Sequence, residues 1–284
     1  MSVERRIVIP GDYPPQLQGS PHLERLADYG NIELYEDLPA DEDELVRRAE
    51  GAPIVINSHG ALKWPASVLE RLPELELISL CSVGTDCVEL EAARRLGIRV
   101  CNQGGHTAPI VAEHEFALML AVAKHLAQFT AELKSGNWQG RELVTLRGKT
   151  IGIVGTGNSG RYMADLCRGI GMNVIAWSFN PRRAWASGRN VTYMELDELF
   201  ARADVVSLHV GLSERTRHLA GREQFQRMKP GAMFINGSRG AVVDTEALVE
   251  ALREGRLRGA GLDVSRAGTA AGQTTHCSRS RRWC

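Results

Sequence analysis

Residues 148–178 constrain the fold of this chain more than any other stretch of the sequence. A short apolar run rich in β-branched residues, Thr150–Val154, is typical of a buried parallel strand. Three glycines follow at the G-x-G-x-x-G spacing, and then come a helical pattern and a second apolar run, Asn173–Trp177. Strand, glycine turn, helix and strand in this order form the context in which the motif binds a dinucleotide.

Each of the three glycines has a separate role in such a turn. Gly155 permits the tight turn from strand to helix, and Gly157 lets a pyrophosphate approach the backbone. Gly160 lets the helix pack closely against the strand. The free N–H groups and the dipole at the start of the helix favour a phosphate. A lone motif of this kind can also be a purely structural turn, but the ordered elements around it favour dinucleotide binding.

The end of the second strand bears on which dinucleotide is bound. An acid about 20 residues after the motif normally holds the ribose 2′-hydroxyl of NAD. Ser178 stands at the matching position, and Arg182 and Arg183 follow it. Two guanidinium groups without a neighbouring carboxylate can pair with a 2′-phosphate. The cofactor is therefore expected to be NAD or NADP, with NADP favoured; the alternative is that both arginines lie on a solvated loop.

The composition is that of a globular protein, with 43% apolar and 24% charged residues. Lysine plus arginine and aspartate plus glutamate number 34 each, and this balance argues against nucleic acid or a membrane surface as a partner. We expect no signal peptide and no membrane-spanning run. The six cysteines lack C-x-x-C spacing, so we expect reduced thiols, a cytoplasmic location and no metal site.

The chain is expected to contain two α/β domains. Alternating strand and helix patterns in residues 1–101 predict a parallel sheet covered by helices, separate from the dinucleotide fold. The glycine-rich segment 102–109 is a plausible domain crossing, and a single helix is predicted over 110–133, ended by Gly136. The dinucleotide-binding domain is expected to span 102–264.

Polar residues follow three apolar runs of the second domain, where the carboxyl ends of the strands would bind a ligand. Arg239 stands after one of them and could hold a substrate carboxylate through two parallel hydrogen bonds; the alternative is a surface arginine. His209 is expected to pack in the interior or stabilise a loop. Asp263 could meet the carboxamide of a nicotinamide or cap the next turn.

Several segments together resemble the D-isomer-specific 2-hydroxyacid dehydrogenases. They are GIVGTGNSG, ADVVSLHVGLSERTRHL, MKPGAMFINGSRGAVVD, GAGLDV, SVGTDCVELEAARRLGIRVCN and VAEHEFALML. The resemblance covers about residues 50–264. It implies a flavodoxin-like substrate domain, a Rossmann NAD(P)-binding domain, an active site in the cleft and a homodimer formed through the nucleotide domains. It also implies hydride transfer between NAD(P)H and a small 2-oxo acid, giving a D-2-hydroxy acid.

The resemblance also assigns roles to residues. Arg239 matches the catalytic arginine, and the backbone N–H groups at Val83 and Gly84 match the loop that helps to hold the substrate carboxylate. The cofactor contacts of the family carry over to Gly157, Asn158, Ser159, Ser178, Val210, Thr216, Asn236 and Asp263. Gly155 and Gly160 of the glycine motif, and Arg182 after the second strand, complete the predicted cofactor site.

Two groups of the family mechanism have no counterpart among the quoted segments. A glutamate would lie where this chain has Gly268, and a histidine would lie in a later P-H-x-G-like segment. His276 is the only histidine of the last 20 residues, and its surroundings do not match. Residues 265–284 are therefore predicted to be an aberrant tail, with a frameshift favoured over a native basic tail. The expected result is impaired turnover; the alternatives are a non-catalytic NAD(P)-binding pseudoenzyme and an unstable truncated product.

Overall fold

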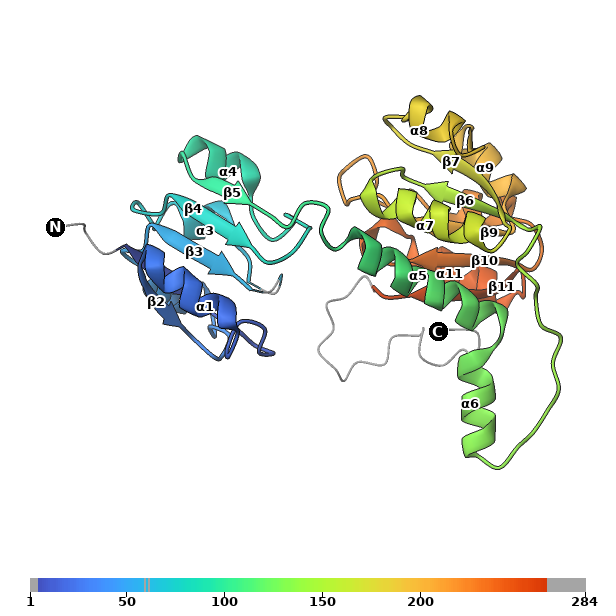
Figure 1. The fold of residues 1–284 in the computed structure, drawn as a ribbon, viewed down its shortest axis with the longest axis horizontal. Coiled ribbons are helices and arrows are strands. Elements are labelled where there is room, and N and C mark those ends of the chain that lie inside the picture. The colour runs from blue at the N-terminus through green and yellow to red at the C-terminus, as the bar shows by residue number, and fades with distance from the viewer. Residues whose placement is uncertain (1–4, 59, 61, 265–284) are drawn as a thin grey trace. The chain divides into compact units, whose positions relative to one another are not determined.

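The computed structural model describes residues 5–58, 60 and 62–264, and the chain divides into two compact units, Met1–His106 and Thr107–Cys284. Each unit contains one parallel sheet with helices around it (Figure 1). The predicted fold class, two doubly wound α/β domains, is confirmed. The division lies inside the glycine-rich segment 102–109. The aberrant tail predicted over 265–284 lies outside the described residues.

The first unit is built on a five-stranded parallel sheet in the order β2-β1-β3-β4-β5. This is the flavodoxin-like strand order. The strands are β1 (Arg6–Ile9), β2 (Asn31–Leu34), β3 (Ile54–Asn57), β4 (Leu77–Leu80) and β5 (Arg99–Cys101). The helices are α1 (Pro21–Leu26), η1 (Ala27–Tyr29), α2 (Glu42–Ala49), α3 (Ala66–Leu69) and α4 (Leu90–Arg95). α2 begins where the Asp41 carboxylate accepts a hydrogen bond from the Glu44 backbone N–H, which satisfies one free donor of the first turn.

The second unit is built on a six-stranded parallel sheet in the order β11-β10-β9-β6-β7-β8. Its strands are β6 (Thr150–Val154), β7 (Asn173–Trp177), β8 (Thr192–Tyr193), β9 (Val205–Leu208), β10 (Ala232–Asn236) and β11 (Leu257–Leu262). This is the order of the doubly wound dinucleotide fold. The strand order reverses between β6 and β9, and such a switch point is where ligands of these sheets bind.

Helices cover both faces of the second sheet, so the central strands β9 and β10 are buried on both sides and are mostly apolar. α5 and α7 lie on one face, and α9, α10 and α11 on the other, because the two groups of helices contribute to separate core clusters. The helices are α5 (Ala108–Ala123), α6 (Leu126–Lys134), α7 (Asn158–Gly169), α8 (Arg183–Ser187), α9 (Leu196–Arg202), α10 (Arg222–Arg227), η2 (Gly240–Val242) and α11 (Thr245–Arg253).

The prediction of one helix over 110–133 is wrong, because the helix breaks at His125. That residue has a left-handed backbone with φ of 52° and begins α6 as its N-cap. Two long-range contacts hold the break: Lys124 Nζ donates to Val144 O at 2.7 Å, and Arg258 Nη2 lies 2.9 Å from His125 Nε2. Because both partners come from distant parts of the chain, helical periodicity contains no sign of the break. The result is that α6 projects from the second unit (Figure 1).

Candidate functional site

The glycine turn after β6 is shaped by close backbone contacts. Gly155 has φ of +103°, and a Cβ on it would lie 2.7 Å from His209 O. A Cβ on Gly160 would lie only 2.0 Å from Gly155 O. Neither position has room for a side chain in this backbone. Gly155 is required for the turn and for its close approach to the loop after β9, and Gly160 is required for the packing of α7 on the turn.

Gly157 is different, because a Cβ there would meet no atom within 4 Å. It is the exposed N-cap of α7, a helix of 12 residues, and Asn158 and Ser159 form the first turn. The space above Gly157 and the free N–H groups of that turn fit the pyrophosphate of a dinucleotide. The Asn158 side chain accepts a hydrogen bond from Arg161 at 2.7 Å.

Ser178 and Arg182 lie in the loop between β7 and α8, beside the glycine turn. Ser178 Oγ accepts a hydrogen bond from the Asn180 backbone N–H at 3.3 Å. The backbone N–H of Arg182 donates to the Tyr193 hydroxyl, which is 2.7 Å from Thr156 Oγ1. Tyr193 thus joins the loop to the residue that follows Gly155. The sequence interpretation missed this link, because it joins three separate segments.

The loop after β9 carries Val210 and Thr216. Val210 is nearly buried, and its Cγ1 lies 2.8 Å from the position of a Cβ on Gly155. The buried Thr216 hydroxyl lies 2.7 Å from both Gly211 O and Ser213 N, so it braces this loop. A contact between Thr216 and a cofactor stays a prediction.

Asn236 and Arg239 belong to the end of β10 and the loop after it. The Asn236 amide is buried; its oxygen accepts from Ser238 N at 3.0 Å, and its nitrogen donates to Arg239 O at 3.1 Å. Asn236 therefore fixes the backbone on which Arg239 stands. The Arg239 side chain is half-buried, and its Nη1 donates to Ser238 O at 2.8 Å. A guanidinium held at the carboxyl end of a central strand has the geometry to bind a carboxylate.

Glu115 and His209 form a fully buried pair beneath this edge of the sheet. His209 Nδ1 lies 2.9 Å from Glu115 Oε2, and the ring's Nε2 lies 2.9 Å from Ser207 Oγ. Because the His209 side chain has no exposed surface and each ring nitrogen lies near a polar side chain, His209 packs in the interior as predicted. A Cβ on Gly237 would lie 2.6 Å from Glu115 Oε1, so Glu115 also supports the loop that bears Arg239.

The sequence interpretation missed Glu115, although a signal was present. Glu115 stands three residues after Ala112 and four before Met119, both of which are buried in α5. A carboxylate on the apolar stripe of a helix needs a buried partner, because an unpaired charge there is costly. The position of Glu115 therefore indicated that it has a buried partner, and the structure shows that this partner is His209.

Asp263 follows β11, and its Oδ1 lies 3.3 Å from His114 Nε2 on α5. Both side chains are about half exposed, so this contact leaves Asp263 accessible. A contact with a nicotinamide carboxamide stays a prediction. Val83 and Gly84 lie in the first unit, in the loop after β4, where Asn102 Nδ2 donates to Val83 O at 2.6 Å. Their approach to a substrate held by Arg239 also stays a prediction.

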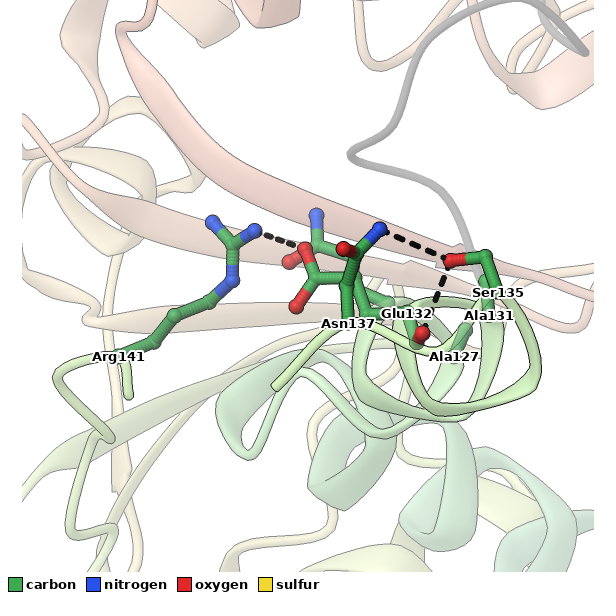
Figure 2. A pocket seen from close by; sticks show the side chains of 7 residues that line it. Ala127, Ala131, Glu132, Ser135, Asn137 and Arg141 are labelled. Atoms are coloured by element: carbon green, nitrogen blue, oxygen red, sulfur yellow. Dashed lines mark hydrogen bonds and ion pairs between the residues drawn. The ribbon is translucent and has the colours of Figure 1, made fainter. Parts of the chain in front are cut away.

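A pocket of about 500 Å³ lies away from these residues, against α6 and the segment that follows it (Figure 2). It is lined by Ala127, Gln128, Ala131, Glu132, Ser135, Asn137 and Arg141. Arg141 points toward Glu132 and forms an ion pair with it, and Asn137 donates to Ser135 Oγ at 3.2 Å (Figure 2). None of the residues predicted for the site lines this pocket.

Within the described residues, no three His, Cys, Asp or Glu side chains gather in a way that could hold a metal ion. Over the same residues, no helix has both the length and the apolar character needed to cross a membrane. The four cysteines that the structure describes are free thiols.

Comparison with known proteins agrees with this geometry. Residues 116–276 match the D-isomer specific 2-hydroxyacid dehydrogenase NAD binding domain, and this match extends past Val264, where the sequence motifs ended. The chain is 38% identical to hydroxypyruvate reductase of Thermotoga maritima over 226 residues, covering 79% of this chain and 72% of the relative. It is 35% identical to glyoxylate reductase of Thermococcus litoralis over 255 residues, covering 85% and 76%.

Among solved structures, D-lactate dehydrogenase from Aquifex aeolicus complexed with NAD and lactic acid superposes with a TM-score of 0.84. That comparison has 27% sequence identity and covers 98% of this chain and 86% of the other. The family match spans more than half of the chain, and the relatives are matched over more than two thirds of their length. The chain therefore belongs to the family of D-isomer specific 2-hydroxyacid dehydrogenases.

Proposed function

We propose that this oxidoreductase interconverts a small 2-oxo acid and the corresponding D-2-hydroxy acid with NAD(P) as cofactor. The observation that carries the proposal is the common location of the glycine turn and Arg239. Both stand at the carboxyl ends of strands in one sheet, at or beside its switch point. When bound, the nicotinamide supplies or accepts the hydride. The names of the relatives, hydroxypyruvate reductase and glyoxylate reductase, support a small 2-oxo acid as substrate.

In this proposal the chain's own residues bind and orient both ligands. The N-terminus of α7 holds the pyrophosphate above Gly157. Arg239 orients the substrate carboxylate through two parallel hydrogen bonds, assisted by the backbone at Val83 and Gly84. The buried Asn236 keeps the Arg239 backbone in place, and the hydrogen bond from Arg239 Nη1 to Ser238 O restrains the guanidinium before the substrate arrives.

The carboxylate role of Arg239 can be tested by binding. Pyruvate and its amide, pyruvamide, are titrated against the NADPH complex of the wild type, Arg239→Lys and Arg239→Met. Charge-assisted hydrogen bonds contribute about 1.5–3 kcal/mol, so Arg239→Met should lower the affinity for pyruvate roughly 10- to 150-fold. Arg239→Lys should also lose affinity, because it keeps the charge without the planar fork. Equal losses for pyruvate and pyruvamide would refute a carboxylate contact.

We further propose that turnover is impaired, because Gly268 stands where the family resemblance places a glutamate. Loss of a general acid–base group costs on the order of 10² to 10⁴ in rate. Cofactor binding with no turnover at all would instead favour the pseudoenzyme. The frameshift hypothesis is tested separately: the gene sequence across codons 260–284 should contain an alternate frame that encodes a glutamate near position 268.

Three finer properties complete the proposal. NADP is favoured over NAD because Ser178 replaces the expected acid and Arg182 and Arg183 lie near it.

A homodimer is supported by α6, which has no buried residue and continues into the exposed Trp138. Exposed apolar surface of this kind marks an interaction site, and a second copy of the chain is the partner proposed. The free thiols support a cytoplasmic location.

A further inference from the structure

The loop between β7 and α8 is held on one side by a hydrogen-bonded tyrosine. The Tyr193 hydroxyl joins Thr156 Oγ1 at 2.7 Å to the Arg182 backbone N–H at 3.0 Å. Tyr193 comes from β8, which pairs with β7 at the edge of the sheet. The backbone that bears Arg182 is thereby fixed beside the glycine turn.

A second contact joins the same loop to the loop after β9. The Arg215 guanidinium stacks on the Phe179 ring, with its central carbon 4.0 Å from the ring centroid. Phe179 in turn packs edge-to-face on Trp177, with centroids 4.7 Å apart. Arg215 comes from the loop after β9, and β6 lies between β9 and β7 in the sheet. The two loops that flank the glycine turn therefore meet through Arg215 and Phe179.

The basic groups around this contact are Arg182, Arg183 and Arg215. Among the described residues, no carboxylate lies within ion-pair distance of Arg182, Arg183 or Arg215. The first acid after Ser178 in the sequence is Glu195. Glu214, the neighbour of Arg215, forms no ion pair with it in that same part of the chain. Stacking on Phe179 also restrains the Arg215 side chain, which lowers the entropy lost when a ligand binds.

We propose that Arg215 is a specificity-determining residue that binds the 2′-phosphate of NADP(H) together with the arginines of the 178–183 loop. A phosphate monoester needs several planar, charged donors, whereas the ribose diol of NAD(H) needs an acceptor such as a carboxylate. The 178–183 loop supplies arginine donors and contains no acid, and the loop after β9 adds Arg215. This inference rests on the proposed dinucleotide binding at Gly157 and adds the residue that selects the cofactor.

The test is the dissociation constant of NADPH and of NADH, measured by fluorescence at fixed ionic strength for four proteins. They are the wild type, Arg215→Ala, Phe179→Leu and Arg217→Ala. Arg217→Ala is the matched control, because Arg217 is exposed in the same loop and its substitution removes the same charge. Arg215→Ala should weaken NADPH binding about tenfold and change NADH binding less than about twofold. Phe179→Leu should give a smaller loss in the same direction, and Arg217→Ala should leave the NADPH/NADH ratio unchanged.

Three results would overturn the inference. Equal weakening of NADPH and NADH in Arg215→Ala would mean that Arg215 only supports the loop. If Arg217→Ala weakened NADPH binding as much as Arg215→Ala does, the overall positive charge of the loop, and not a specific contact of Arg215, would account for NADPH binding. If the wild type binds neither cofactor, the proposed function itself fails and this inference fails with it. If the wild type binds both and Arg215→Ala leaves their ratio unchanged, only the inference fails.

Discussion

The glycine turn makes a prediction that separates binding from folding, using Gly157→Ala and Gly160→Ala. A methyl group on Gly157 meets no atom within 4 Å, and the residue has an ordinary φ of −66°. Alanine lowers the entropy of the unfolded chain but is a poorer N-cap than glycine, so these effects, each up to about 1 kcal/mol, nearly cancel. The variant should unfold like the wild type.

Binding by Gly157→Ala should nevertheless be damaged, because the methyl group occupies the space through which the pyrophosphate approaches. Overpacking of this kind costs about 1–3 kcal/mol, which weakens NADH and NADPH alike by roughly 5- to 150-fold. Titration of each dinucleotide by fluorescence or calorimetry measures the loss.

Gly160→Ala should differ from Gly157→Ala by lowering the stability of the fold. Its methyl group would lie 2.0 Å from Gly155 O, so backbone must move by about 1 Å to restore van der Waals contact. The same cost of about 1–3 kcal/mol then falls on the folded state and should lower the melting temperature by roughly 2–12 °C. Gly169→Ala, at the far end of α7 with no atom within 4 Å, is the control and should keep both stability and binding. Wild-type affinity in Gly157→Ala, or wild-type stability in Gly160→Ala, would refute this reasoning.

Three further predictions concern stability, reactivity and assembly. Burial, and then the charge of Arg258, lower the pKa of His125 from 6.5, so the unfolded chain binds more protons below that pH. The free energy of unfolding, measured with urea, should therefore fall as the pH drops below 6.5. It should fall less in His125→Asn, because asparagine tolerates the left-handed backbone and does not titrate. Equal losses of stability in the wild type and in His125→Asn would contradict this prediction. Burial raises the pKa of the Cys167 thiol to about 12, so alkylation at pH 8 should label the exposed Cys101 and spare Cys167 until the chain unfolds. Sedimentation should give a dimer that Trp138→Ser weakens, and a wild-type monomer at micromolar concentration would refute the homodimer.

Much of the second unit was predictable because its signals are local. The apolar runs that become β6 and β7, and the spacing of the glycines between them, lie within 30 residues of sequence. The order of strands and helices then fixed the polar loop after β10, and with it Arg239, at the carboxyl edge of the sheet.

Three features that sequence interpretation missed depend on contacts between distant segments and have no local signal. The break before α6 rests on His125 meeting Arg258, and the support of the 178–183 loop rests on Tyr193. The contact between Phe179 and Arg215 joins loops that follow different strands. Periodicity and motif spacing describe neighbours along one element, so they contain no information on such pairs.

The most direct test of the central claim, that this chain binds a nicotinamide dinucleotide and a 2-oxo acid at one site, is a single-turnover experiment. The protein is saturated with NADPH, binding is followed by fluorescence, and oxidation of NADPH is followed after addition of hydroxypyruvate. The hydroxypyruvate reductase of Thermotoga maritima is measured in parallel. We predict saturable binding, and oxidation slower than that of the relative by about 10² to 10⁴. Absence of saturable binding of both NADPH and NADH would contradict the claim.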